Sequence, residues 1–376
     1  VNQYRYNGGF YADAQGEFFK KHLLTTLAGR YENYSDFGGN LSYNANARWD
    51  FSKSEDAKAK FVLRTSFSHG FRAPSLHQIY LSNVQTLVSN GTLSNQITFN
   101  NESKALNLLG VPKLKSEKGN NFSVGFTSDF ILSKEVSLSV VLDGYYSLIN
   151  DRIVFTGGLG DSDTSTVSLI DSLLAPNNAT SLKFFTNGVN SQTLGVDANL
   201  RFKYRKDDKH SFILTLAGNY NKTQVSDLKT PEPLKNEGNI LFDRKEKSRI
   251  ESIRPLYKGI FNLDYFLGKW GVGIHNTLFG AVTWRYFKIN EPLSVMESRD
   301  QTFSSKTLTD FIIKYNFSDK MNLSIEAYNI FNVYPDKIIP NGSAGTNLGG
   351  RTMYSREATQ FNINGRYIFL KMGVVF

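Results

Sequence analysis

The last segment of the chain reads Arg366-Tyr367-Ile368-Phe369-Leu370-Lys371-Met372-Gly373-Val374-Val375-Phe376. Every second residue from Ile368 to Phe376 is apolar, whereas Lys371 lies on the opposite face. This period of two predicts a β-strand, and its two different faces predict contact with two different solvents. The segment is long enough to cross a bilayer at a tilt. In a closed membrane barrel, such a terminal strand would pair with the first strand and leave no edge.

The composition agrees with a membrane wall built from strands. The mean hydropathy is −0.33 and no run of about eighteen apolar residues occurs, which excludes a helical membrane protein. The aromatic content of 14% fits aromatic girdles at two membrane interfaces. Cysteine is absent, which excludes thiol catalysis, disulfides and cysteine metal sites. The net charge of +9 is scattered and not clustered with aromatic residues, so we expect anionic outer-membrane lipid and lipopolysaccharide as partners and no nucleic acid.

Apolar and polar residues alternate in segment after segment along the chain, which predicts an all-β protein of a single domain over residues 1–376. The clearest case is 194–204, where six apolar residues oppose a face that carries Asp197, Arg201 and Lys203. We expect about thirteen strands, at 10–18, 23–31, 41–51, 61–67, 122–126, 136–142, 194–204, 212–220, 261–267, 272–284, 311–317, 323–327 and 366–376.

The connections between these segments alternate between two kinds. The short, polar ones follow every other strand, and the others are mostly long, at about 69–116, 151–190, 226–257, 289–303 and 333–363. Short turns on one rim and long loops on the other are typical of an outer-membrane β-barrel. A soluble β-sandwich, the alternative fold, has no reason to sort its loops in this way.

The same alternation predicts that the chain begins on the extracellular side with an odd number of strands. Single-chain bacterial barrels have even numbers of strands and begin in the periplasm. We therefore expect that Val1 is not the natural start and that the rest of the barrel is missing or is supplied by a second polypeptide.

Three stretches together resemble the TonB-dependent outer-membrane receptors. They are Gly29-Arg30-Tyr31-Glu32-Asn33-Tyr34-Ser35-Asp36-Phe37-Gly38, then Ser66-Phe67-Ser68-His69-Gly70-Phe71-Arg72-Ala73-Pro74-Ser75-Leu76 followed by Tyr80, and Ala327-Tyr328-Asn329-Ile330-Phe331-Asn332-Val333-Tyr334. The second contains the most specific of the three motifs, the phenylalanine-arginine-alanine-proline box of that family. The terminal Phe376 is also similar to the family's assembly signal.

The resemblance implies an antiparallel transmembrane barrel of 22 strands around an N-terminal plug, of which this chain supplies the last thirteen strands without the plug. It implies an outer-membrane receptor that binds a large, scarce ligand at extracellular loops. Import would be driven by the TonB complex acting through the plug. The family's modal ligand is a ferric siderophore, while haem, cobalamin, an oligosaccharide and a peptide stay open as alternatives. A surface lipoprotein that caps the loops stays open as a further partner. No enzyme activity and no cofactor are expected.

Candidate ligand-binding residues follow from the family box. His69 and His77 flank it, and Arg72 lies within it, where we expect it to pair with wall or loop carboxylates. The family's asparagine box of haem receptors is not matched at 111–117, which argues against haem. We expect Asp197, Arg201, Lys203 and Arg285 to face the lumen or plug, and Trp270, Trp284 and Tyr286 to lie in membrane girdles. The five histidines show no metal-ligand spacing, so no metal site is predicted.

Two other functions remain open from the sequence alone. A passive channel of porin type would share the barrel but would not need such long loops. An outer-membrane enzyme would need a catalytic histidine at a loop base, and His69 is the only candidate.

Overall fold

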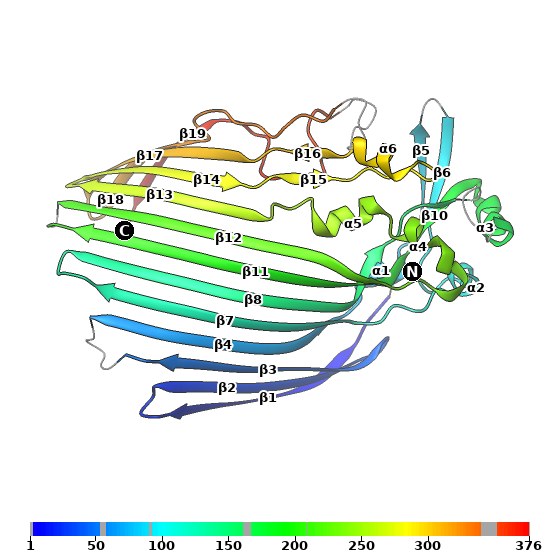
Figure 1. Cartoon of the computed structure of the whole chain (residues 1–376), viewed down its shortest axis with the longest axis horizontal. Helices are drawn as coiled ribbons and strands as arrows, with labels where there is room; N and C mark the ends of the chain where they lie inside the picture. Colours follow the sequence, from blue (N-terminus) through cyan, green and yellow to red (C-terminus); the bar gives the residue numbers. More distant parts are fainter. Residues whose placement is uncertain are drawn as a thin grey trace.

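A computed structural model describes residues 3–52, 58–89, 92–160, 167–207, 209–339 and 352–375. Within them, thirteen strands form one antiparallel sheet (Figure 1). In sheet order these strands are β1 (Asn7–Phe18), β2 (Leu23–Tyr34), β3 (Gly38–Asp50), β4 (Ala59–Arg72), β7 (Glu117–Ile131), β8 (Val136–Phe155), β11 (Phe185–Arg205), β12 (His210–Leu228), β13 (Tyr257–Leu267), β14 (Trp270–Phe279), β17 (Lys306–Ser318), β18 (Met321–Tyr328) and β19 (Tyr367–Val374). The prediction of about thirteen strands is confirmed.

The two ends of the sheet differ as the sequence predicted. Short turns follow β1, β3, β7, β11, β13 and β17, and they lie together at one end, at the left in Figure 1. Long connections follow β4, β8, β12, β14 and β18 at the other end. We call these two ends the turn rim and the loop rim.

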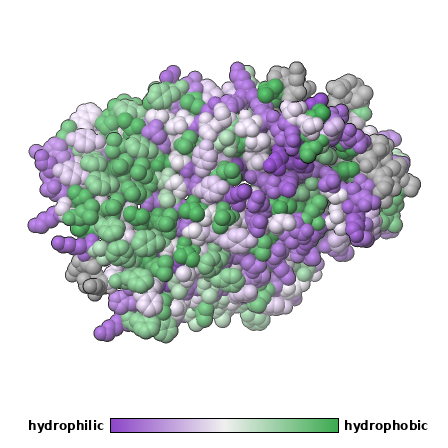
Figure 2. Space-filling view, viewed as in Figure 1, coloured by the Kyte–Doolittle hydropathy of each residue, from purple (hydrophilic) through white to green (hydrophobic). Residues whose placement is uncertain are grey.

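The register keeps one apolar and one polar face across the whole sheet. On the apolar face large side chains are exposed, such as Phe10 at 83% and Leu27 at 61%. They form a hydrophobic band that crosses the strands, bounded by polar surface toward both rims (Figure 2). Tyr31, Tyr146 and Tyr220 lie on the apolar face, toward the loop rim. Between these tyrosines and the turn rim, the charged residues of the described strands all lie on the polar face. A sheet with these two faces is built to separate lipid from water.

Aromatic side chains gather on the apolar face beside the turn rim. Neighbouring rings there lie with centroids about 5 to 6 Å apart, in the pairs Phe19–Trp49, Phe61–Phe130, Tyr204–Phe212 and Trp270–Tyr315. Aromatic rings prefer the boundary between headgroups and acyl chains because they are apolar bodies with polar edges. These pairs therefore mark one membrane interface, as expected for Trp270.

The structure corrects three details of the sequence analysis. Strands β8 and β11 continue into segments expected to be loop, so they contain 20 and 21 residues. Strand β14 ends at Phe279, and Trp284 belongs to a separate pair of strands, β15 (Val282–Trp284) and β16 (Gln301–Phe303). There Trp284 is buried and so is not part of a membrane girdle. Strands β1 and β19 are the two edges of the sheet and do not pair with each other within the described residues.

The connections at the loop rim fold into structure of their own. They contain the small sheet of β5 (Asn83–Ser89), β6 (Thr92–Thr98), β10 (Ala179–Lys183) and β9 (Leu159–Gly160). Their helices are α1 (Leu76–Tyr80), α2 (Lys104–Leu108), α3 (Val167–Leu174), α4 (Gly238–Leu241), α5 (Arg244–Glu251) and α6 (Leu293–Ser298), with the short 3-10 helices η1 (Ala175–Asn177) and η2 (Glu232–Glu237). No helix among the described residues is long and apolar enough to cross a membrane.

Among the hydrophobic clusters of the described residues, two join three connections each. The larger joins the connections after β4, β8 and β12 and includes Leu106, Ile170, Leu182 and Leu234. The smaller joins those after β12, β14 and β18 around Trp284. Because loops normally lack a core, these clusters indicate a preformed surface on the loop rim and not a set of independent loops.

Candidate functional site

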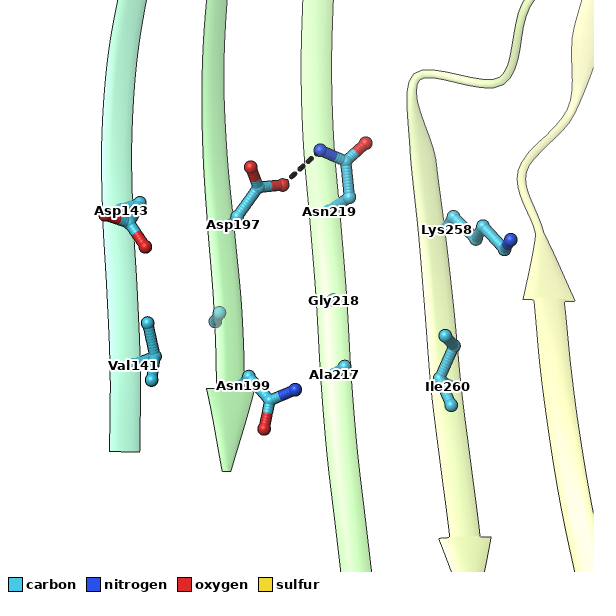
Figure 3. Close-up of a pocket in the computed structure, with 10 residues that line it drawn as sticks. Val141, Asp143, Asp197, Asn199, Ala217, Gly218, Asn219, Lys258 and Ile260 are labelled. Atoms are coloured by element: carbon cyan, nitrogen blue, oxygen red, sulfur yellow. Dashed lines mark hydrogen bonds between the residues drawn. The ribbon is translucent and has the colours of Figure 1, made fainter. Parts of the chain in front are cut away.

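A row of charged and polar side chains crosses the polar face of the sheet at one level. Strand register places Arg64, Asp143, Asp197, Asn219 and Lys258 in this row, on β4, β8, β11, β12 and β13. We call these five residues the wall row. Four of them, with neighbouring residues, line a cavity of about 350 Å³ (Figure 3).

The two carboxylates of the wall row are direct cross-strand neighbours, and each has its own partner. Like charges opposite each other destabilise a sheet unless they are compensated. Arg64 Nη2 donates to Asp143 Oδ1 at 2.9 Å, and Asn219 donates its amide to Asp197. Acids in the middle of the row and cations on both sides therefore form a fixed charge pattern on this wall.

The ion pair between Arg64 and Asp143 passes over β7, which lies between their strands, at Gly125. A Cβ atom at Gly125 would overlap Oδ1 of Asp143 and lie 2.9 Å from Nη2 of Arg64. Glycine leaves room here for two side chains from neighbouring strands that meet directly above its Cα atom.

We expect Gly125→Ala to displace this ion pair and to lower stability by about 1 kcal/mol, since both ionic side chains are partly exposed and can move. Gly144→Ala on β8 is the control, because a Cβ atom there would have nothing within 4 Å. The measurement is the temperature at which each variant loses its folded, fast-migrating form on gels of unboiled samples. Equal temperatures for both variants would contradict this account of Gly125.

A second group of charges lies among the loop-rim connections, around α5. Asp243 caps this helix, because its Oδ1 accepts from the backbone N–H of Glu246 at 2.8 Å. Arg249 donates to Glu246 Oε2 at 2.6 Å and to Glu357 Oε1 at 2.7 Å. Trp284 Nε1 also donates to Glu357, at 3.1 Å. Residues from three different connections are thereby joined through the Arg249 guanidinium and the Glu357 carboxylate. We call this group of four residues, Glu246, Arg249, Trp284 and Glu357, the Arg249 hub.

The two carboxylates of the hub are affected in opposite directions. Burial is the largest influence on Glu246 and raises its pKa, although Arg249 opposes this. Burial also acts to raise the pKa of Glu357, but the hydrogen bonds and charge of Arg249, with the Trp284 indole, outweigh it and lower that pKa. Arg249 therefore supplies to the buried Glu246 carboxylate the stabilisation that bulk solvent cannot give.

Lys183, at the end of β10, differs from the other cations of this region. Its ammonium lies 5.5 Å from the ring centroid of Phe155, and the Phe155 and Phe185 rings are 4.8 Å apart. Among the described residues it forms no ion pair with a carboxylate. Burial, and then the nearby Lys245, lower its pKa. A half-buried cation beside two aromatic rings is suited to an anionic aromatic group.

The residues predicted to bind ligand do not form one site. His69 lies on the apolar face, where it stacks on Tyr43 with centroids 5.1 Å apart and its Nδ1 is 2.8 Å from Asn120 Oδ1. Arg72 lies on the polar face and pairs with Glu117, Nη2 to Oε1, at 2.7 Å. This confirms the expected pairing of Arg72 with a wall carboxylate. His77 lies in α1, so the three side chains belong to different surroundings.

The residues predicted to face the lumen or plug are placed as follows. Asp197, Arg201 and Lys203 alternate along β11 on the polar face, with Asp197 in the wall row. Arg285 follows β15 among the loop-rim connections and lies 3.3 Å from Glu251 of α5. It therefore lies at the loop rim, beside α5, and not on a long strand.

The sequence analysis did not identify the wall-row partners Arg64 and Asp143, the Arg249 hub or Lys183. Alternation could assign Arg64 and Asp143 to the polar face, but only strand register shows that they meet. No local signal marks Arg249 or Lys183, because their partners are distant along the chain. The described residues contain no group of three side chains suited to hold a metal ion.

Comparisons with known proteins agree with this geometry. The family model described as TonB dependent receptor-like, beta-barrel, matches residues 1–330. Among solved structures, the ferric enterobactin receptor of Pseudomonas aeruginosa matches with TM-score 0.61, 14% identity and coverage of 98% of this chain and 45% of that chain. A siderophore receptor of Acinetobacter baumannii has TM-score 0.61, 18% identity and coverage of 98% and 46%. The FrpB iron transporter of Neisseria meningitidis has TM-score 0.59, 12% identity and coverage of 98% and 45%.

These identities support the fold, and the chain spans less than half the length of the solved structures that it matches. No curated protein sequence matches the chain.

Proposed function

The chain belongs to the TonB-dependent receptor-like β-barrel family of the outer membrane, and we propose that it forms the wall and ligand-binding loops of an active importer. The observation that carries this proposal is the sheet with an apolar and a polar face, joined at one rim to connections with their own hydrophobic cores. The wall would hold the loop surface above the membrane while the polar face lines the path of the ligand.

The two open edges of the sheet bear on how the barrel is completed. β1 and β19 are the first and the last of thirteen antiparallel strands, so they run in the same direction, toward the turn rim. Antiparallel closure therefore needs an odd number of further strands between these edges. We propose that such strands, and a plug that contacts Asp197, Arg201, Lys203 and the TonB complex, complete the importer.

The proposed ligand is a ferric siderophore with anionic aromatic groups. Two of the three solved structures described above are named as siderophore or ferric enterobactin receptors. In this chain, Lys183 with Phe155 and Phe185 offers the matching chemistry at the loop rim. We propose this cluster as the contact for the ligand, in place of His69, whose ring lies on the apolar face.

We expect Lys183→Ala to weaken binding of a ferric tris-catecholate by about 10-fold to 100-fold, because one charge-assisted contact contributes roughly 1.5–3 kcal/mol. Lys104→Ala is the control, since Lys104 is an exposed lysine of α2 on the same rim. The dissociation constant is measured on intact cells that carry the protein in their outer membrane. Equal affinities for both variants would rule out Lys183 as a ligand contact.

Energy coupling separates the importer from the passive channel. In cells that carry the protein, a protonophore should stop accumulation of ⁵⁵Fe-labelled siderophore inside the cell while surface binding continues. Accumulation that persists without proton motive force would favour a porin-type channel.

An outer-membrane enzyme is the remaining alternative. The family is one of transport receptors. On the apolar face, Nδ1 of His69 lies within hydrogen-bond distance of Asn120 Oδ1, at 2.8 Å. Hydrolysis of a surface substrate that His69→Ala abolishes would restore the enzyme as a candidate.

A further inference from the structure

Two arginines lie side by side on the polar face of the sheet. Strand register continues the wall row from Arg64 on β4 to Arg48 on β3, and these two residues are direct cross-strand partners. Beyond Arg48 the row continues to Leu24 of β2 and Glu17 of β1, whose carboxylate lies 3.9 Å from Lys21. Like charges directly opposite each other, with Cβ atoms about 4.5–5.5 Å apart, destabilise a sheet. The wall therefore has two adjacent cations here that need an anion close to both.

The acids of the wall engage these arginines only in part. Arg64 contacts Asp143 through Nη2 alone, at 2.9 and 3.1 Å from the two carboxylate oxygens, and its Nε is buried without a hydrogen-bond partner among the described residues. In the described part of the chain Arg48 donates one hydrogen bond, from Nη2 to Asp50 Oδ2 at 3.3 Å. Each guanidinium has five N–H donors. Most donors of the pair thus have no acceptor in the described wall.

Arg48 and Arg64 both line one cavity of about 330 Å³ on the polar face. Ser66 and Ser123 also line it, and their hydroxyl groups are further hydrogen-bond donors. Asp143 is the one acid among the described lining residues, and Arg64 already pairs with it. The cavity is therefore suited to a group that carries negative charge and accepts hydrogen bonds.

We propose that Arg48 and Arg64 form a binding site for one oxyanion, a carboxylate or a phosphate group, on the polar face of the wall. Guanidinium groups bind such anions through paired N–H···O hydrogen bonds, and two of them on neighbouring strands contact one anion together. The anion is either a free solute or a carboxylate of a polypeptide segment that packs against the wall. This site lies away from the loop rim, so it does not depend on the proposed contact of Lys183 with the imported ligand.

The test measures the effect of phosphate on the protein purified from outer membranes. At constant ionic strength, phosphate should raise the temperature at which the folded, fast-migrating form is lost on gels of unboiled samples. The dissociation constant obtained from this rise should be about tenfold higher for Arg48→Gln, because one charge-assisted contact is removed. Lys314→Gln is the control, since Lys314 also lies on the polar face but on β17, outside the cavity, and this variant should retain the affinity of the wild type.

The stability of Arg48→Gln without phosphate distinguishes the two sources of the anion. For a free solute, this variant should be at least as stable as the wild type, because the repulsion between the arginines is removed. For a carboxylate of the polypeptide, phosphate should have no effect on the wild type, and Arg48→Gln should lose its folded form at a lower temperature.

A cross-link identifies a polypeptide carboxylate directly. In Arg48→Lys, carbodiimide activates a nearby carboxylate, one of whose oxygens leaves with the reagent as a urea, and the lysine amine forms an amide bond in its place. A cross-link to a carboxylate outside the thirteen-stranded sheet supports the polypeptide source. The proposal is overturned if phosphate binds the wild type, Arg48→Gln and Lys314→Gln with equal affinity, if Lys314→Gln loses as much affinity as Arg48→Gln, or if phosphate has no effect and no such cross-link forms.

Discussion

Replacing Arg249 with alanine is expected to open the loop-rim surface while the membrane wall remains folded. The substitution leaves Glu246, whose side chain is only 6% exposed, with Lys245 at 4.0 Å as its one remaining cation among the described residues, and it releases Glu357 in a different connection. Removal of one partner from a buried ion pair is costly because the remaining charge has no water around it. Because Arg249 itself is 36% exposed, we expect a loss of about 2–4 kcal/mol, in the lower part of the usual range for buried pairs.

The measurement is protease cleavage of the loops on intact cells, with the wall followed by gel migration of unboiled samples. We expect rapid cleavage in the connections after β12 and β18, with the folded form of the wall retained. Lys235→Ala is the matched control, because Lys235 pairs with Glu232 in the same connection but both side chains are more than 70% exposed. Such a pair contributes less than about 1 kcal/mol. Similar cleavage of the two variants would show that the hub does not hold the loops.

Leu200→Arg is expected to prevent assembly of the protein in the outer membrane. Leu200 lies on the apolar face of β11, between Val140 of β8 and Leu216 of β12. It is near the middle of the hydrophobic band, where a guanidinium facing lipid costs about 2–4 kcal/mol. The amount of protein recovered in the outer-membrane fraction should therefore fall strongly.

Asn199→Arg is the control for this prediction, because Asn199 and Leu200 are adjacent on β11 but lie on opposite faces of the sheet. Asn199 lies on the polar face, beside the carboxylate of Asp197 that can accept the new cation. We expect normal assembly of this variant. If both variants assembled equally well, the apolar face would not be the face that contacts lipid.

Both predictions depend on a difference in how the wall and the loop surface are stabilised. The wall is stabilised by backbone pairing along strands of up to 21 residues, so it tolerates the loss of a single loop contact. The loop surface depends on a few buried groups, and Lys183 lies close to the charges of the Arg249 hub. Opening the hub is therefore also expected to disturb the proposed ligand contact, whereas Gly125→Ala, which acts on the wall row, is not.

The alternation of apolar and polar residues was sufficient to predict the thirteen strands, their two faces and the two kinds of connection. In a β-strand, side-chain direction alternates with every residue, so the solvent on each side is recorded locally in the sequence. Strand ends were predicted less well. β8 and β11 extend beyond the hydrophobic band, where apolar and polar residues no longer alternate, as at Leu148-Ile149 and Ile153-Val154-Phe155 of β8.

The candidate site could be predicted only in part. Asp197, Arg201 and Lys203 were assigned to one face correctly from their spacing, and Arg72 was expected to find a carboxylate. His69 was selected because it lies in a family motif, yet its position in β4 directs it to the apolar face with Tyr43. Trp284 was expected in a girdle, but it is buried because the connection after β14 folds back on those after β12 and β18.

The sequence by itself thus determined the strands, their faces and the family, because each depends on residues that are neighbours along the chain. Only the tertiary structure decided which charges meet. Arg64 and Asp143 are 79 residues apart and meet through strand register above Gly125, and Arg249 and Glu357 are 108 residues apart and meet through the packing of separate connections. Such contacts depend on register and on loop packing, which are set by the whole sheet and leave no local pattern in the sequence.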